Sequence, residues 1–252
     1  MKSNPVFKIV ALVIAFFVFI YFFIFYFFED HSTKQNTLSA QEKQDGWILL
    51  FDGESTKGWH MFSKPNMNHA WKAINGELTT STNDTLGTHG DIVTDGVYEN
   101  FELVFDWKIA REGNSGVFIN VQDDTSYIAT WATGPEYQLL DNPNMQAGYL
   151  DGGKKGAGAL YGLAPLKTSV EPNPAGEWNN SRIMQVNGKI NFWLNGVMTC
   201  EEQIGSDRWK DLVASSKAAV FPDFSKSTKG HIGLQDWAKG VSFKNIKIRI
   251  IQ

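Results

Sequence analysis

The segment 134–141 carries the polar side chains that are best placed for chemistry. In an extended chain Glu136, Gln138 and Leu140 point to one face, with neighbouring side chains about 6.6 Å apart. A carboxylate therefore lies beside an amide, as in a groove lined for hydrogen bonding. The same pattern also describes the solvated face of a sheet, and these residues alone favour that simpler interpretation.

Carboxylate pairs of the kind that retaining glycoside hydrolases place on one strand are missing. Neither Glu-x-Asp-x-x-Glu nor Glu-x-Asp-x-Glu occurs in the sequence. Glu102 and Asp106 lie four residues apart, but they belong to the polar face of an otherwise apolar strand, so we expect both to face solvent. This pattern weakens the hypothesis of hydrolysis by two paired carboxylates and does not exclude it.

Other catalytic motifs are not supported either. There is no Gly-x-Ser-x-Gly elbow for a serine nucleophile, and 114–116 is typical of a turn that enters a strand. The glycine-rich stretch 148–162 contains Lys154 and Lys155 but lacks the ending of a phosphate-binding loop, so we expect a mobile surface loop that closes over a site.

Metal binding stays open. The five histidines have no ligand spacing, and His89 and His231 are expected to be ordinary surface or strand-end residues. Ligands contributed by separate strands leave no local motif, so a divalent metal is neither supported nor excluded, and no cofactor is certain.

The elements that must position these side chains are strands. Residues 101–109 alternate apolar and polar, which predicts a strand with one buried face. The Asn-Gly pairs at 75–76, 187–188 and 195–196 lie between apolar runs and predict three hairpins. The alternation in residues 241–250 shifts by one near Asn245, which predicts a β-bulge. Residues 206–217 alone look helical, and the whole pattern indicates an all-β sandwich of two antiparallel sheets.

The N-terminus predicts a membrane anchor. Residues 6–28 are almost unbroken apolar with Lys8 as the only charge, long enough for one transmembrane helix, so residues 1–28 form a cytoplasmic stub and span. Residues 29–45 are polar and are expected to be a flexible tether. The charge bias around the span places the domain of residues 46–252 in the periplasm or outside the cell.

Composition narrows the choice of partners. The formal net charge is −4 and the Lys and Arg residues are scattered, so nucleic acid is excluded as an expected partner. Cys200 is the single cysteine, so no intrachain disulfide can form, and it is expected to be a buried strand residue.

From about residue 45 to 251 the chain resembles the 3-keto-disaccharide hydrolase family, a group of concanavalin A-like, jelly-roll β-sandwiches. The resemblance rests on short pieces in the family's order, each weak alone. They are residues 47–53, 58–59, 71–78, 90–94, 98–103, 106–108, 114–117, 134–138 with 141, 158–161, 174–179, 193–196, 230–236 and 243–246.

This resemblance implies cleavage of glycosides whose sugar unit carries a ketone at C3. The ketone acidifies the proton on C2, so a base can remove it, the glycosidic oxygen leaves C1 by elimination, and water then adds. The substrate would be a carbohydrate supplied by a separate sugar 3-dehydrogenase, which becomes a pathway partner.

The resemblance also reverses the interpretation of the 134–141 strand and assigns roles to motif positions. Glu136 becomes the candidate base, and Asp236 and Asp141 become candidates for acid work or metal ligation. Gln138 and Asn114 become hydrogen-bond donors to substrate. Tyr161 and Trp237 complete the expected substrate contacts.

One position departs from the family. Where many members read Gln-Asp-His-Gly, this chain has Trp237 after Asp236. The loss of that histidine favours a non-catalytic carbohydrate-binding domain as the alternative, and a conventional glycoside hydrolase remains a further one. An aromatic ring there can also serve as a platform for a sugar.

Overall fold

The computed structural model describes residues 35–81, 85 and 87–252. Their compact body begins at Asn36 and runs to the end of the chain. Within these residues no helix is long and apolar enough to cross a membrane. The predicted span, residues 6–28, lies outside the described part.

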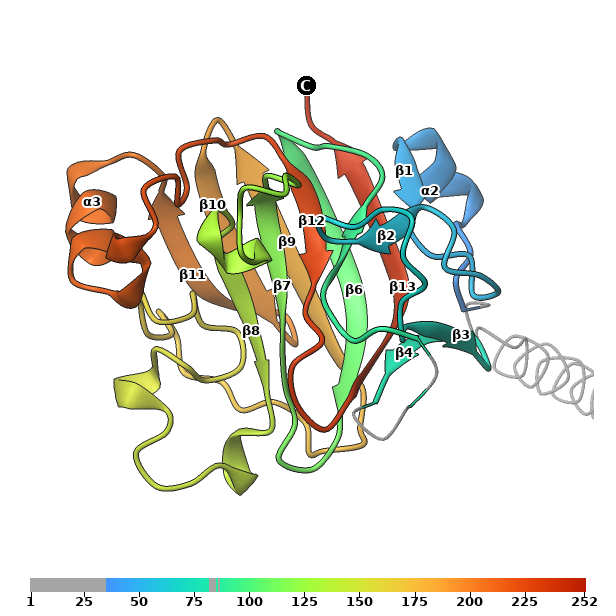
Figure 1. Ribbon diagram of the computed structural model, residues 1–252, viewed down its shortest axis with the longest axis horizontal. Helices are drawn as coiled ribbons and strands as arrows, with labels where there is room; N and C mark the ends of the chain where they lie inside the picture. Colours follow the sequence, from blue (N-terminus) through green and yellow to red (C-terminus); the bar gives the residue numbers. More distant parts are fainter. Residues whose placement is uncertain (1–34, 82–84, 86) are drawn as a thin grey trace, which may run out of the picture. The chain divides into compact units, whose positions relative to one another are not determined.

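The described chain forms two antiparallel sheets. The larger has the order β11-β10-β9-β6-β13-β4-β3, with β1 also paired to β13, and the smaller has the order β2-β5-β12-β7-β8. Figure 1 shows β7, β8 and β12 in one layer, overlapping β6, β9 and β10 of the other. The predicted all-β sandwich of two antiparallel sheets is confirmed. The strands are β1 (Trp47–Leu49), β2 (Trp59–Met61), β3 (Lys72–Ile74), β4 (Glu77–Thr80), β5 (Ile92–Thr94), β6 (Phe101–Ile109), β7 (Asn114–Val121), β8 (Glu136–Leu140), β9 (Asn179–Val186), β10 (Lys189–Leu194), β11 (Val197–Gln203), β12 (His231–Leu234) and β13 (Val241–Ile250).

Helical segments are short. They are α2 (Ala40–Gln44), α3 (Asp207–Ala214) and the 3-10 turns η1 (Thr130–Ala132), η2 (Asn142–Asn144), η3 (Asp151–Gly153) and η4 (Lys217–Val220). The predicted helix is α3, which begins after the N-cap Ser206, buries Trp209 and lies beside β11 (Figure 1).

The turns follow the sequence signals. Each of the three Asn-Gly pairs joins two paired strands, β3 to β4, β9 to β10 and β10 to β11, with positive φ at both residues. The register of β13 against β6 shifts between Lys244 and Lys247, and Asn245 has φ of 53°. The predicted hairpins and bulge are therefore confirmed.

The core fills the space between the sheets. Large side chains from both sheets are fully buried there, among them Phe105, Trp107, Tyr137, Phe192 and Phe243. Each such side chain contributes roughly 1.5–3 kcal/mol by leaving water. The Tyr137 hydroxyl is hydrogen-bonded to the Ser181 hydroxyl at 2.7 Å, so β8 is fixed across the core to β9.

Two expectations about polar segments are wrong. Residues 36–45 do not behave as a tether: Asn36 is buried and exchanges hydrogen bonds with Asn245, and Ser39 and Glu42 form a capping box that starts α2. Glu102 is on the outer face, as expected, but it is buried because Arg182 and Arg249 each bind its carboxylate at 2.5 Å.

The glycine-rich stretch also differs from the expected mobile loop. Gln138 donates its backbone N–H to Ala159 O at 3.1 Å, and Gly158 donates to Gln138 O at 2.8 Å. Tyr161 donates to Glu136 O at 3.0 Å. The loop therefore covers the outer edge of β8, which would otherwise present unpaired backbone groups.

Candidate functional site

The register of β7 against β8 decides which side chains share the outer face of the small sheet. Gly116 lies opposite Gln138, and Phe118 lies opposite Glu136. Directly opposed residues project to the same side, so Glu136 and Gln138 are on the outer face while Tyr137 enters the core. The predicted alignment of Glu136 and Gln138 on one face is what the strand shows.

Glu136 is a buried carboxyl group on this face. Its residue is 7% exposed. Burial raises the pKa of Glu136 well above its ordinary value, and the nearby Asp91 carboxylate raises it further. The side chain passes over Gly116, where an added Cβ would lie 2.8 Å from Glu136 Cγ and Cδ. A glycine in the 114–116 motif is thus required by the path of Glu136.

An amide chain extends from this carboxyl group. In the orientation that satisfies its neighbours, the Gln138 amide donates to Glu136 Oε1 and to Ser115 O, each at 3.1 Å. With the Asn114 amide turned in the same way, Asn114 donates to the Gln138 side-chain oxygen at 3.1 Å and accepts from the Tyr149 hydroxyl at 2.8 Å. The order Tyr149, Asn114, Gln138, Glu136 forms a continuous polar chain.

Asp91 is the residue that sequence reasoning missed. It precedes β5 and accepts hydrogen bonds from Thr130 Oγ1 at 2.5 Å and from the backbone N–H of Asp236 at 3.0 Å. Burial raises its pKa to about 6, against the lowering effect of these two bonds, and the charge of Asp236 adds to the rise. Asp91 belonged to a motif piece, but nothing in its spacing from residue 136 could reveal their proximity.

Asp236 joins the same group through Asp91. Its carboxylate accepts from the Gly90 N–H at 3.1 Å and is bonded to His89 Nδ1 at 2.6 Å. The Asp236 side chain is only 4% exposed, whereas that of His89 is 39% exposed. His89, expected to be an ordinary surface residue, instead places an imidazole beside Asp236. We call Glu136, Gln138, Asn114, Asp91 and Asp236 the Glu136 cluster.

Two tyrosines from the loop after β8 border the cluster. Burial raises the pKa of Tyr161 to about 12, and the charge of Glu136 contributes to that rise. Burial and the charge of Glu136 also raise the pKa of Tyr149. Lys155 lies 5.7 Å above the Tyr149 ring. Both hydroxyls therefore stay protonated near neutral pH and remain hydrogen-bond donors.

Trp237 lies at the exposed margin of the site. Its residue is 58% exposed and its ring meets the Trp131 ring edge to face at 5.8 Å. The next residue, Ala238, exchanges backbone hydrogen bonds with Asn114. The turn that carries Trp237 is thereby fixed to the strand that carries Asn114, as a platform for a sugar ring requires.

Asp141 does not join the Glu136 cluster. It follows β8 and lies five residues beyond Glu136, which is about 16 Å along a strand. Its carboxylate accepts from the Glu112 N–H at 2.8 Å and from the Asn144 amide at 3.1 Å. These contacts anchor the turn between β6 and β7, and the predicted catalytic role of Asp141 is not part of the Glu136 cluster.

The cluster does not form an evident metal centre. In residues 35–81, 85 and 87–252 no group of three or more His, Cys, Asp or Glu side chains is arranged to hold a metal ion. Around Glu136 lie the carboxyl groups of Asp91 and Asp236 together with amides, hydroxyls and the His89 imidazole.

Comparison with known proteins agrees with these features. Residues 46–249 match the model of the 3-keto-alpha-glucoside-1,2-lyase-like domain. A 3-keto-disaccharide hydrolase of Bacteroides thetaiotaomicron is 28% identical over 87% of this chain and 83% of its own length. Two crystal structures of putative glycosyl hydrolases from Parabacteroides distasonis are similar. One is 37% identical over 87% of this chain and 100% of its own, with a TM-score of 0.78; the other is 26% identical over 81% and 99%, with a TM-score of 0.61.

Proposed function

Because this chain belongs to the 3-keto-alpha-glucoside-1,2-lyase-like domain family, we propose that it cleaves the glycosidic bond of 3-keto-glycosides, including 3-keto-disaccharides. The observation that carries the proposal is the Glu136 carboxyl group, whose pKa is raised by burial and which is hydrogen-bonded to Gln138. A single buried carboxyl group beside an amide suits proton abstraction from carbon, whereas a conventional glycosidase uses a pair of carboxylates.

In the proposed reaction Glu136 removes the proton on C2. The ketone at C3 acidifies that proton, and the electron pair of the C2–H bond moves to form an enolate whose negative charge lies on the C3 oxygen. A carboxylate with a raised pKa is a stronger base than an ordinary one, so the transfer is less unfavourable. Its basic form predominates only above its raised pKa, so activity should rise with pH.

The amide chain supplies the groups that can stabilise the enolate. Asn114 and Gln138 are held in place by each other, by Tyr149 and by the backbone of Ser115. Fixed donors directed at a developing negative charge are worth several kcal/mol where water is excluded. Tyr161 and Trp237 would contact the sugar ring at the border of the cluster.

The leaving group requires a proton donor, and His89 is the residue we assign to it. Its Nδ1 lies 2.6 Å from Asp236 Oδ2, which fixes the orientation of the ring, and the side chain is accessible. When the enolate collapses, the C1–O bond breaks and the departing oxygen takes the proton from His89. The oxygen of a water molecule then bonds to C1 of the resulting C1=C2 double bond, one proton of that water passes to the deprotonated His89, and Glu136 returns its proton to C2.

The decisive assay uses the purified full chain, a 3-keto-disaccharide and the unoxidised parent sugar. We expect product from the keto sugar alone, and Glu136→Gln should abolish it. Glu177→Gln, which changes an exposed carboxylate in the turn before β9, is the matched control and should retain activity. Full activity of Glu136→Gln would remove Glu136 from the role of base.

A non-catalytic carbohydrate-binding domain is the second candidate. The exposed Trp237, placed over Trp131, favours it, because such a platform binds sugars without chemistry. The same assay separates the cases. Binding of both sugars without product supports this second function, and cleavage of the unoxidised parent supports a conventional glycoside hydrolase.

The proposal extends to place and pathway. A 3-keto sugar must come from a sugar dehydrogenase, so we propose such an enzyme as the upstream partner.

We also propose that the N-terminal segment, residues 6–28, anchors the protein in a membrane, and that the domain of residues 46–252 lies in the periplasm or at the cell exterior. Membrane fractionation followed by protease treatment of intact spheroplasts tests this: the domain should sediment with membranes and be digested.

A further inference from the structure

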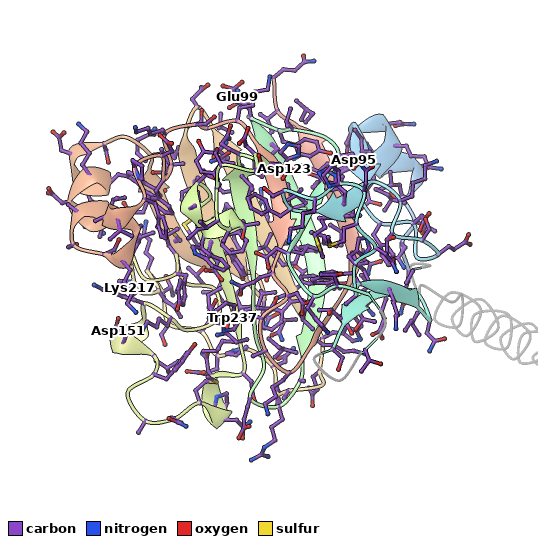
Figure 2. All side chains as sticks on the ribbon, in the orientation of Figure 1. Asp95, Glu99, Asp123, Asp151, Lys217 and Trp237 are labelled. Atoms are coloured by element: carbon purple, nitrogen blue, oxygen red, sulfur yellow. The ribbon has the colours of Figure 1, made fainter. Side chains whose placement is uncertain are left out.

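A second polar group lies at the other end of the small sheet. His60 on β2 is bonded through Nδ1 to Asp95 at 2.6 Å and through Nε2 to Asp123 at 2.9 Å. Its ring meets His231 edge to face at 6.1 Å. We call His60, Asp95, Asp123 and His231 the His60 cluster. Figure 2 shows Asp95 and Asp123 close together at the top of the view and Trp237 in the lower half.

An open cavity of about 540 Å³ lies beside the His60 cluster. This volume is within the range of about 300–1,000 Å³ that is typical of small-molecule sites. None of its lining residues belongs to the Glu136 cluster, so it is a separate site. Its polar and aromatic lining includes Asp123, Asp124, Ser126, Tyr127, Lys229 and His231.

The charges in this cavity are mixed. Asp123 is already paired with His60. The Asp124 carboxylate accepts hydrogen bonds from Ser126 of its own loop, and these bonds lower its pKa and keep it ionised. Over the described part of the chain, no carboxylate pairs with the Lys229 ammonium group. One available anion, one available cation and the Tyr127 ring suit an uncharged, polyhydroxylated ring better than an ion of either sign.

One loop connects the cavity to the Glu136 cluster. Residues 123, 124, 126 and 127 line the cavity, while Thr130 of the same loop binds Asp91 and Trp131 contacts Trp237. Phe118, which lies opposite Glu136, is five residues from Asp123, or about 17 Å along an extended chain. A carbohydrate that reaches both places would be longer than a disaccharide.

We propose that this cavity is a second carbohydrate-binding subsite, which holds a remote sugar unit of an oligosaccharide whose reacting unit lies at Glu136. The substrate class rests on the proposed function. Asp124 would accept hydrogen bonds from sugar hydroxyls, Lys229 would donate them, and Tyr127 would contact the ring face. The loop 123–133 would contact the segment of the ligand between the two sites.

Calorimetric titration with unoxidised α- and β-linked gluco-oligosaccharides of two to six units tests this subsite without turnover. We expect at least one series to bind more tightly as it lengthens. Lys229→Gln and Asp124→Asn should each weaken binding of the longer members by about tenfold and leave the disaccharide unchanged. Lys217→Gln is the matched control, because this exposed lysine lies away from Asp123 in Figure 2, and it should bind like the parent.

Affinity that does not depend on length, or that both cavity variants retain, would overturn the subsite. The outcome is separable from that of the proposed function. A chain that binds oligosaccharides through Lys229 but releases nothing from 3-keto sugars keeps the subsite and loses the enzyme. A chain that cleaves 3-keto-disaccharides but shows no effect of the cavity variants keeps the enzyme and loses the subsite.

Discussion

The Glu136 and His60 clusters lie on the same face of one sheet, yet their carboxylates have opposite surroundings. Asp123 and Asp95 share a histidine between them. Glu136 has an amide and another acid beside it, and its pKa is raised. The difference is one of available positive charge: a carboxylate paired with a cation is a structural group, whereas a buried carboxylate without one is prepared to hold or take a proton.

The largest expected effect comes from Glu136→Gln. Removing a general base typically lowers the rate by 10²–10⁴-fold, and we expect kcat for a 3-keto-disaccharide to fall by about 10³-fold or more. The folded protein should not be destabilised at pH 7, because a neutral amide avoids the burial of a charge. Steady-state kinetics checks the loss of kcat, and thermal unfolding checks the stability. A lower melting temperature of Glu136→Gln at neutral pH would contradict the expectation that burial disfavours the charged form of Glu136.

Gly116→Ala should come next. The new methyl group would overlap the Glu136 side chain and push it from its place, although the catalytic carboxyl remains in the sequence. We expect kcat/KM to fall by about 10²-fold, since small displacements of a catalytic group have effects of this size. Gly196→Ala is a control for glycine replacement in general, since its added Cβ meets no neighbour, although its positive φ adds strain. Unchanged kcat/KM in Gly116→Ala would contradict the proposed path of Glu136.

Asp91→Asn tests the acid beside Glu136. Replacing it removes a negative charge, so the pKa of Glu136 should fall and the rising limb of the pH–rate profile should move to lower pH. The rate itself should drop by only about tenfold, because Asp91 is not assigned a proton transfer. If the pH–rate profile of Asp91→Asn does not move, the charge of Asp91 does not affect the pKa of Glu136.

Asp91 also affects stability with a definite sign. Its pKa is raised from 3.8 to about 6 in the folded protein. Between these values the unfolded chain releases a proton that the folded one keeps, so stability falls as pH rises from about 4 to 6. The change is on the order of 1–3 kcal/mol. Urea unfolding at pH 4 and pH 6.5 should show it in the parent chain and less of it in Asp91→Asn.

His60→Gln should have the smallest effect on activity and should lower stability mainly at low pH. Burial lowers the pKa of His60, but its hydrogen bonds to Asp123 and Asp95 outweigh this and raise the pKa above 6.5. The stabilisation is therefore complete below about pH 6.5 and is lost as pH rises through the folded value. We expect a loss of about 1 kcal/mol at pH 6, a smaller loss at pH 9, and unchanged turnover of a disaccharide. A large loss of disaccharide turnover would contradict the division between the clusters.

Local signals predicted much of the fold. Alternation along residues 101–109, the Asn-Gly turns and the phase shift at Asn245 each act over a few residues, and the structure has all of them. The expected tether failed because the buried contact of Asn36 with Asn245 joins residues 209 apart in the sequence. Composition describes a segment by itself and cannot report such a partner.

The site was predictable only where it follows one strand. Glu136 and Gln138 share a face by simple alternation, but Asp91 and His89 reach them through the order of strands in the sheet. That order places β12 between β5 and β7 and is not encoded in local spacing. Asp141 lies apart from the Glu136 cluster, because closeness in sequence to Glu136 does not place it on the same face, and its catalytic role stays a prediction.

The pKa of Glu136 is the most direct test of the account. Carbon-detected NMR of side-chain carboxyl groups, assigned with Glu136→Gln, can follow the titration of Glu136. We predict that Glu136 titrates well above the ordinary glutamate value, because its carboxyl group is buried and lies near the Asp91 carboxylate. Ionisation of Glu136 at or below its ordinary value of about 4.5 would contradict it.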